Sequence, residues 1–459
     1  MNKELEEFNN SLKDKKVAVI GAGVSNLPLF SYLNEVGALV TLFDKKKLED
    51  LSSSVKDCIS KYKINLSLGD NYLENLVGFD VIFRSPSCLP TNPYLAREIE
   101  RGAVVTTEVA EVVRLAPCKV IGVTGSDGKT TTTTLIAKML EKLGYRVFLG
   151  GNIGKPIFTS IKDMKSDDIV VLELSSFQLM DMEVSPDISV ITNISPNHLD
   201  IHGTYQEYID AKKNIFKHQN SDGIVVLNYD DELVRSFDKE ASGEVRYFSG
   251  RTNLDDSYVL EGEYMKYNDE IIIDTKDLKI RGRHNYINIC TALSAIHDYV
   301  DLDKVLPMLK SFGGVNHRIE FIRELDGVKW YNDSASSTPT RTIAGISAFS
   351  EPIVLIAGGS SKNISYAPLA KPIIDNVSKL ILFGATKNKI YDAVMEEVRR
   401  NNSDLKIYVL DTLEEVVSVA KEISVPGEVV LFSPASASFD MFKNAYQRGD
   451  LFKEMVNKL

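Results

Sequence analysis

The chain has 459 residues, enough for about three domains of ordinary size. Apolar residues make up 44% of it, which allows several buried cores and excludes a disordered chain. The net charge of −11 makes nucleic acid and anionic membrane surfaces poor partners in bulk, but it is compatible with a local basic pocket for a phosphorylated small molecule.

The cysteines and the N-terminus indicate a cytoplasmic protein. Cys58, Cys88, Cys118 and Cys290 form no close pair, so reduced thiols are expected rather than a zinc site or a disulfide framework. The polar N-terminus is unlike a signal peptide, and no apolar run approaches the ~20 residues that span a bilayer. No apolar interface stripe stands out, so we expect a monomer with small-molecule partners, no nucleic acid and no membrane.

The first domain is expected over residues 1–115. Residues 17–44 have the pattern of a strand, a glycine loop, a helix and a second strand. Short apolar runs at Ile64–Leu68 and Val81–Arg84 alternate with helical stretches. This alternation predicts an α/β domain with a parallel sheet and covering helices.

The loop Gly21-Ala-Gly-Val-Ser-Asn26 follows a strand and opens a helix, where glycines let the backbone approach a phosphate. The third fingerprint position is Asn26 rather than glycine, and Asp44 closes the next strand near where a ribose-reading acid would lie. A phosphate- or nucleotide-bearing ligand therefore fits better than the dinucleotide of a dehydrogenase. A tight turn without a ligand is the remaining alternative.

Two further α/β domains are expected. Residues 116–314 continue the rhythm of strands and helices, and residues 315–459 form a third block of regularly spaced strands. Residues 242–283 differ, because short alternating runs between Gly and Asp turns predict an antiparallel β insertion. A helix is expected at Tyr286–Val300.

A second glycine loop, TGSDGKT at 124–130, also follows a strand and opens a helix. The strict P-loop pattern fails, because it needs a glycine where Val123 stands. The shorter loop still directs backbone N–H groups at phosphates, with Lys129 to neutralise charge and Thr130 to offer a hydroxyl to Mg²⁺. A glycine turn with a solvated lysine is the alternative.

Glu173 ends the apolar run IVVLE. A carboxylate at the tip of a buried strand is costly unless it is paired or bound to a metal. We therefore expect Glu173 to bind Mg²⁺, with a satisfied polar strand end as the alternative.

Motifs along nearly the whole chain resemble the Mur ligase family, the ATP-dependent amide ligases of peptidoglycan precursor synthesis. The motifs are TGSDGKT (124–130), GGNIG (150–154), ELSSFQL (173–179), NHLD (197–200), HRIE (317–320), YNDS (331–334), GGSSK (358–362) and SPASASFDMFKNAYQRG (433–449). The resemblance implies a Rossmann-like N-terminal domain for the UDP substrate, a central P-loop-type ATPase domain and a C-terminal Rossmann-like domain for the amino acid. The GAGVSN loop, ELSSFQL and the C-terminal motif fit best the members that join D-glutamate to UDP-N-acetylmuramoyl-L-alanine through an acyl phosphate.

The resemblance also implies roles for individual residues. Catalysis would involve Lys129, Glu173, His198 and Lys212, and two Mg²⁺ ions would be held by Thr130, Glu173, His198 and a carbamylated Lys212, for which Lys213 is the competitor. Contacts to ATP are expected from Gly125, Ser126, Asp127, Gly128, Lys129, Thr130, Thr131, Asn285, Asn288, Arg318 and Asp333. Contacts to the other substrates are expected from Ser25, Asp44, Lys45, Asn152, Ser337, Lys362 and Ser438.

Three positions depart from the family pattern. Asp127 stands where the family usually has Asn, Ala335 where it commonly has Lys, and Ser360 where an acid often precedes the lysine of GGSSK. The last two bear on substrate positioning, so a ligase that adds a different amino acid, or one that acts on folate, is an alternative. An oxidoreductase would leave Lys129 and Glu173 unexplained, and a non-catalytic nucleotide-binding protein is kept open by Ala335.

Overall fold

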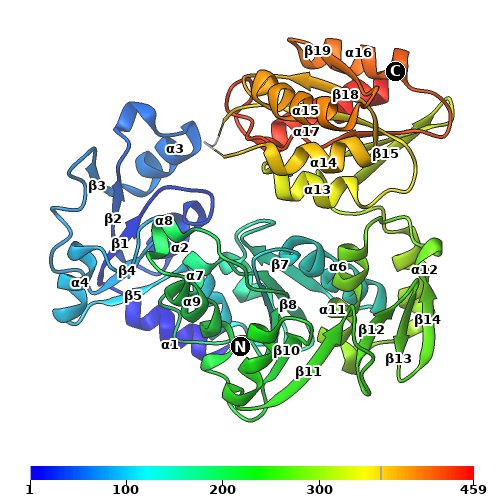
Figure 1. Ribbon diagram of the computed structural model, residues 1–459. Coiled ribbons are helices and arrows are strands. Elements are labelled where there is room, and N and C mark those ends of the chain that lie inside the picture. Colours follow the sequence, from blue (N-terminus) through cyan, green and yellow to red (C-terminus); the bar gives the residue numbers. More distant parts are fainter. Residues whose placement is uncertain (1, 362–363) are drawn as a thin grey trace. The chain divides into compact units, whose positions relative to one another are not determined.

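The computed structural model describes residues 2–361 and 364–459, and the chain forms two compact units (Figure 1). The first unit comprises Met1–Ile272 and Ile287–Val305, and the second comprises Ile273–Tyr286 and Leu306–Leu459. Within the described residues, no helix combines the length and the apolar character needed to cross a membrane.

The first sheet has five parallel strands in the order β3-β2-β1-β4-β5. The chain builds outward from β1 in one direction and then returns to its other side with β4, so the order reverses between these two strands. Ligands of open α/β sheets bind at the carboxyl ends of the strands at such a reversal. The strands are β1 (Lys16–Ile20), β2 (Leu39–Asp44), β3 (Asn65–Leu68), β4 (Val81–Phe83) and β5 (Val104–Thr106), and the helices are α1 (Lys3–Leu12), α2 (Leu27–Glu35), η1 (Leu48–Asp50), α3 (Ser53–Tyr62), α4 (Pro93–Glu100) and α5 (Glu108–Leu115).

The second sheet has nine strands in the order β14-β13-β12-β11-β10-β9-β6-β8-β7. Here the reversal lies at β6, which pairs in parallel with β8 on one side and with β9 on the other. The strands are β6 (Lys119–Thr124), β7 (Val147–Gly151), β8 (Ile169–Glu173), β9 (Ile188–Ile191), β10 (Ile224–Asn228), β11 (Glu244–Ser249), β12 (Tyr258–Glu261), β13 (Tyr264–Tyr267) and β14 (Glu270–Asp274). The helices are α6 (Lys129–Leu143), η2 (Phe158–Asp163), α7 (Ser176–Leu179), α8 (Leu199–His202), α9 (Tyr205–Lys217), α10 (Glu232–Arg235), η3 (Ser236–Glu240), η4 (Thr275–Asp277), α11 (Arg283–Ala295), η5 (His297–Tyr299) and α12 (Leu302–Ser311).

The expected antiparallel insertion is only partly antiparallel. Strand β11 pairs in parallel with β10, and β12 pairs in parallel with β11. The helical segments α10 and η3 lie between β10 and β11, and a crossover of this kind brings the next strand back in the same direction. Strands β12 and β13 form an antiparallel pair, and their connection is a tight turn at Gly262, whose φ is +58°.

The first two sheets share one hydrophobic core. Phe158 of η2 packs edge-on against Phe8, Tyr32 and Phe83, which come from the elements around the first sheet. The buried carboxylate of Glu108 accepts hydrogen bonds from the N–H groups of Ile157 and Phe158. The two sheets therefore form one packed body, which agrees with their place in a single compact unit.

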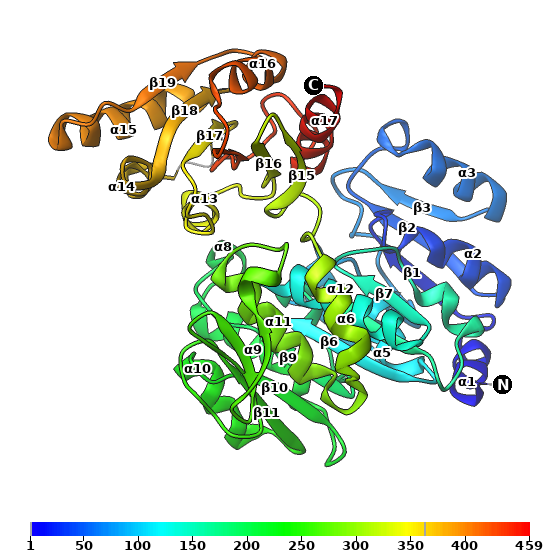
Figure 2. The same cartoon turned by 90° about the vertical axis from the view of Figure 1, so that its right-hand side faces the viewer.

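The sheet of the second unit has six strands in the order β15-β16-β20-β17-β18-β19. Strand β15 is antiparallel to β16, and the other pairs are parallel. Apolar residues of α13, α14 and α15 cover one face, and those of α16 and α17 cover the other (Figure 2). The strands are β15 (Glu320–Leu325), β16 (Val328–Asn332), β17 (Ile353–Gly358), β18 (Val377–Phe383), β19 (Lys406–Val409) and β20 (Val429–Phe432), and the helices are α13 (Pro339–Ile346), α14 (Ala367–Asn376), α15 (Lys387–Asn401), α16 (Leu413–Ile423) and α17 (Ala445–Lys458).

Candidate active site

The second glycine loop follows β6 in the nine-stranded second sheet, called the central sheet below, at the point where the strand order reverses. Its Lys129 begins α6 and donates from Nζ to the carbonyl oxygens of Gly125 at 2.8 Å and Ser126 at 3.1 Å. Gly125 and Gly128 have φ values of +146° and +83°. A Cβ at Gly128 would lie 2.5 Å from Oδ1 of Asn288, and one at Gly125 would overlap the Thr192 hydroxyl. Both positions therefore require glycine.

The threonine run belongs mainly to the packing of α6. Thr131, Thr132 and Thr133 are buried, and the hydroxyl of Thr133 donates to the carbonyl of Lys129. Thr130 is half-buried at the first turn of the helix. Of the two expected threonine contacts to ATP, Thr130 is thus the more accessible.

Thr192 and Asn193, which directly follow β9, hydrogen-bond the backbone of the glycine loop at Asp127. Asn193 Oδ1 accepts from the Asp127 N–H at 3.0 Å, and the Thr192 hydroxyl donates to the Asp127 carbonyl at 2.6 Å. Asp127 itself is exposed, so its acidic side chain replaces the usual amide without entering the core. Sequence reasoning did not assign a role to Thr192 and Asn193. Their position directly after an apolar strand was the available signal.

Glu173 ends β8 beside the loop and is buried. Its Oε1 accepts from Asn152 Nδ2 at 2.7 Å, whereas its Oε2 is buried and has no hydrogen-bond partner among the described residues. Such an orphaned carboxylate oxygen is costly unless a cation meets it. Glu173 thus offers one oxygen to a metal ion.

A magnesium ion fits this donor set, although the described residues bring no three His, Cys, Asp or Glu side chains together as a metal site. Mg²⁺ is usually held by one or two carboxylates together with substrate phosphates and water. The orphaned Oε2 of Glu173 and the hydroxyl of Thr130 at the helix start are ligands of that kind.

Lys212 of α9 is buried against the same loop. Its Nζ donates to the Gly125 carbonyl at 2.9 Å and to Thr124 Oγ1 at 3.2 Å, and lies 4.8 Å from the centre of the Tyr208 ring. Burial, and next the ammonium of Lys129, hold the pKa of Lys212 well below its ordinary value. Lys213, the competitor for this role, forms an ion pair with Glu240 instead.

Two histidines lie beside Phe177 of α7, and only one of them was expected. His198 is exposed, with a φ of +55° and its ring 5.1 Å from that of Phe177. His202, four residues later, is buried, stacks on Phe177 and has Nε2 at 2.9 Å from the Ser176 hydroxyl. Its position one helical turn after His198 was the signal that could have identified it.

The first glycine loop is held by its own polar side chains. Asn26 is buried and donates to the carbonyls of Ile20 and Gly21, so it stabilises the turn at the third fingerprint position. Both carboxylate oxygens of Asp44 accept backbone N–H groups, from Ala22 and from Lys46. The structure thus ties Asp44 to the loop; Ser25 is half-buried and Lys45 is exposed.

In the second unit, Asp333 and Ser337 follow the carboxyl end of β16, and Ser438 follows that of β20. Asp333 is buried and accepts from the Ser433 hydroxyl at 2.7 Å and from the Ile319 N–H at 3.2 Å. Burial raises its pKa to about 6. Asp333 is thus hydrogen-bonded inside the domain, and its expected contact to ATP stays a prediction.

The remaining residues predicted to contact ATP or the other substrates differ in burial. Arg318 and Ser337 are half-buried, and Ser438 is buried. In α11, Asn285 Nδ2 donates to the Arg281 carbonyl at 2.7 Å, and Asn288 Oδ1 lies 3.4 Å from the Thr132 hydroxyl. Lys362 lies outside the described residues.

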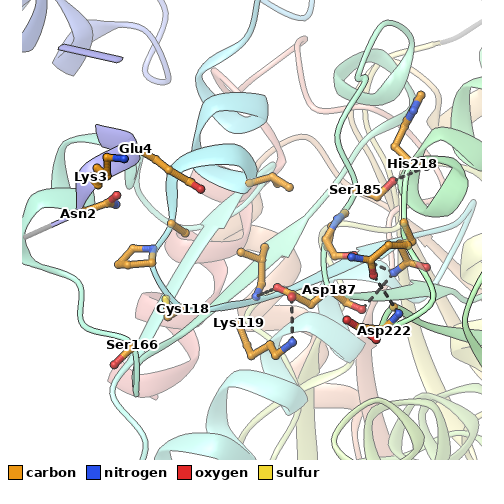
Figure 3. Close-up of a pocket in the computed structure, with 18 residues that line it drawn as sticks. Asn2, Lys3, Glu4, Cys118, Lys119, Ser166, Ser185, Asp187, His218 and Asp222 are labelled. Carbon is orange, nitrogen blue, oxygen red and sulfur yellow. Dashed lines mark hydrogen bonds and ion pairs between the residues drawn. The ribbon is translucent and has the colours of Figure 1, made fainter. Parts of the chain in front are cut away.

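A cavity of about 750 Å³ lies at the opposite end of the central sheet, at the start of β6 (Figure 3). In it, Asp187 accepts from Lys119 Nζ at 3.0 Å and from the Val120 N–H at 2.8 Å. None of the residues predicted for the active site lines this cavity. The loop after β6, rather than this cavity, is therefore the candidate active site.

Comparisons with known proteins agree with this location. The sequence profile of the Mur ligase middle domain matches residues 123–296, and that of the Mur ligase glutamate ligase domain matches residues 317–436. The chain is 47% identical over 459 residues to a UDP-N-acetylmuramoylalanine–D-glutamate ligase of Clostridium botulinum (strain Langeland), and 46% identical over 460 residues to the enzyme of that name from Clostridium perfringens (strain 13), with 100% of each chain covered.

Solved structures share the fold. UDP-N-acetylmuramate-alanine ligase from Thermotoga maritima has a TM-score of 0.62 at 21% identity, and covers 97% of this chain and 99% of its own. MurF ligase from Thermotoga maritima, in complex with ADP, has a TM-score of 0.58 at 19% identity, and the match covers 98% of this chain and 96% of the MurF chain. At these identities the likeness shows the α/β fold alone.

Proposed function

This chain belongs to the Mur ligase family, and we propose that it joins D-glutamate to UDP-N-acetylmuramoyl-L-alanine while ATP is converted to ADP and phosphate. The choice of substrates rests on the full-length relatives that carry that name. Residues 1–115 would bind the UDP substrate, residues 116–314 ATP, and residues 315–459 the amino acid.

One observation carries the ATP-dependent part of the proposal. The glycine loop with Lys129, the orphaned oxygen of Glu173 and the buried amine of Lys212 all lie at the carboxyl edge of the central sheet around β6. Binding of a nucleoside triphosphate requires a helix N-terminus, a lysine and a carboxylate at one sheet edge. A dinucleotide oxidoreductase would use the helix N-terminus but would leave Lys129, Glu173 and Lys212 without a role.

In the first step, the alanyl carboxylate of the substrate attacks the γ-phosphorus of ATP, and the bond from that phosphorus to the bridging oxygen of ADP breaks. The product is an acyl phosphate. Lys129 and the N–H groups at the start of α6 would neutralise charge on the transferring group, because this chemistry depends mainly on positioning and electrostatics.

Magnesium would be held by Glu173 and Thr130 together with substrate oxygens. When bound, the ion polarises the phosphoryl oxygens as a Lewis acid. Asn152 orients the Glu173 carboxylate through a hydrogen bond. Thr192 and Asn193 hold the loop backbone at residue 127.

In the second step, the neutral amine of D-glutamate attacks the acyl carbon. The tetrahedral adduct loses a proton from its nitrogen, the bond from the acyl carbon to the phosphate oxygen breaks, and an amide and inorganic phosphate are left. We propose that Lys212 is carbamylated in the working enzyme, since its neutral amine can add carbon dioxide and the carbamate would face the loop as an anion. Exclusion of water is needed while the acyl phosphate exists.

The test is release of phosphate from ATP with UDP-N-acetylmuramoyl-L-alanine and, separately, D-glutamate, L-glutamate, D-aspartate, L-lysine or no amino acid, in bicarbonate and Mg²⁺. Release with D-glutamate alone is expected. Release with another amino acid would keep the mechanism and change the acceptor, whereas no release with any of them would refute the proposal. Lys129→Ala is expected to abolish turnover without unfolding the protein.

A further inference from the structure

Arg448 is a fully buried arginine in the first turn of α17. Its Nε donates to the Ser334 hydroxyl at 3.0 Å, and its Nη2 donates to the Ser334 carbonyl at 2.8 Å and the Ser436 carbonyl at 3.1 Å. Its Nη1 donates to the Ala437 carbonyl at 2.9 Å. The side chain thus connects two segments that lie about 100 residues apart in the sequence.

The charge of Arg448 has no direct counterion among the described residues. All four acceptors are carbonyl or hydroxyl oxygens. Asp440 attracts the guanidinium from a distance, while its own carboxylate accepts from the Ala385 N–H at 3.0 Å. Burial lowers the pKa of Arg448 to about 10. A buried cation without a paired anion is costly, so its retention calls for an explanation.

The segments that Arg448 joins carry two of the expected substrate contacts, Ser337 and Ser438. Ser334 leads from β16 toward Ser337, and Ala437 precedes Ser438 after β20. Gly359, after β17, packs so closely that a Cβ there would lie 2.9 Å from Nη1 of Arg448. Strands β16, β20 and β17 are neighbours in the sheet, so the guanidinium lies below three adjacent carboxyl ends, where ligands of such sheets bind.

We propose that Arg448 is a positioning residue for the acceptor amino acid, which it selects by holding the Ser334–Ser337 and Ser436–Ser438 segments in place and by supplying a positive field that favours a second carboxylate. The inference rests on the proposed function, in which the acceptor carries two carboxylates. Position 335 lacks the lysine common in the family, and the buried guanidinium supplies a positive charge nearby, since it donates to the residue directly before Ala335.

The experiment compares Arg448→Met, which removes the charge, with Arg448→Lys, which keeps it. Arg323 supplies the matched control, because this half-buried arginine of β15 also donates to backbone carbonyls, those of Val456 and Asn457. KM for D-glutamate and KM for ATP are measured for each variant, together with thermal unfolding. D-glutamate is then compared with D-glutamine, which has one carboxylate fewer, as acceptor or as competitor.

For Arg448→Met we expect KM for D-glutamate to rise about tenfold or more, KM for ATP to stay within about twofold, and the preference for D-glutamate over D-glutamine to fall by a similar factor. Arg448→Lys should recover most of the preference, and Arg323→Met should change neither constant. Equal losses with both acceptors, or with ATP as well, would show that Arg448 is merely structural.

Two further outcomes are distinguishable. If Arg448→Met does not fold, the preference measured with Arg448→Lys and Arg448→Gln decides, and an unchanged ratio in a folded variant overturns the proposal. If the wild type uses another acceptor, the proposed function fails, while Arg448 is judged by the same comparison between that acceptor and its amide or uncharged analogue.

Discussion

The side-chain amines of Lys129 and Lys212 donate to the same acceptor, the carbonyl oxygen of Gly125, at 2.8 Å and 2.9 Å. Two ammonium groups on one oxygen repel each other, and Lys212 is the buried one. Burial and then the charge of Lys129 lower the pKa of Lys212 well below its ordinary value. The surroundings of Lys212 therefore favour loss of its proton, next to a phosphate-type loop.

A neutral amine is the form that adds carbon dioxide, so we predict a carbamate on Lys212. With ¹³C-labelled bicarbonate, a carbamate carbon resonance should appear in the wild type and disappear in Lys212→Met. Lys213→Met is the matched control, because Lys213 is engaged by Glu240 and should leave the resonance unchanged. A resonance that survives Lys212→Met would place the modification elsewhere.

Glu173→Gln should raise the Mg²⁺ concentration needed for half-maximal turnover and lower the maximal rate by about 100-fold or more, because an amide replaces the charged oxygen expected to meet the ion. Without Mg²⁺, the variant should unfold at a temperature no lower than the wild type, since Oε2 has no hydrogen bond to lose. Glu108→Gln, a buried carboxylate that binds backbone N–H groups, is the control and should leave the Mg²⁺ requirement alone. An unchanged Mg²⁺ requirement in Glu173→Gln would contradict the assignment.

The two glycines at the ends of α6 separate backbone strain from loss of the ligand site. Gly128 and Gly144 both have positive φ, but a Cβ at Gly144 meets open space, whereas one at Gly128 approaches Asn288 Oδ1 at 2.5 Å. Gly144→Ala should cost about 1 kcal/mol of unfolding free energy and leave ATP affinity unchanged. Gly128→Ala should lose stability and, in calorimetric titration, ATP affinity as well. Equal ATP affinity in the two variants would argue against a phosphate loop.

Asp333 should make stability depend on pH. Burial raises its pKa from 3.8 to about 6, so between these values the folded state binds more protons than the unfolded state. The stabilising contribution is complete below pH 3.8 and is lost as pH rises through about 6. The difference in unfolding free energy between wild type and Asp333→Asn should therefore shift against the wild type by about 2 kcal/mol from pH 4 to 7.

Urea unfolding at several pH values across that window measures this shift. Asp326→Asn, in the exposed turn between β15 and β16, is the matched control. A wild type and an Asp333→Asn variant with parallel pH profiles would mean that Asp333 titrates normally.

Part of the candidate site could be predicted from the sequence because several of its residues are close together in the chain. Gly125 to Lys129 form a continuous segment between a strand and a helix, so the sequence alone predicts a phosphate-binding loop there. Glu173 was accessible to the same reasoning, because an acid at the end of a buried strand reaches the sheet edge. By contrast, the parallel pairing of β10, β11 and β12 was missed, because short alternating runs do not reveal which neighbour a strand chooses.

By itself the sequence determined the α/β class, the two glycine loops and the family, because each depends on residue types at short spacing along one segment. Tertiary structure decided what depends on distant partners. Lys212 and Lys213 are consecutive on a helix and point about 100° apart, so only packing selects the one that faces Gly125. Arg448 joins Ser334, which is 114 positions away, to nearby Ser436 and Ala437, and no local pattern records that a buried charge will lie beneath three strand ends.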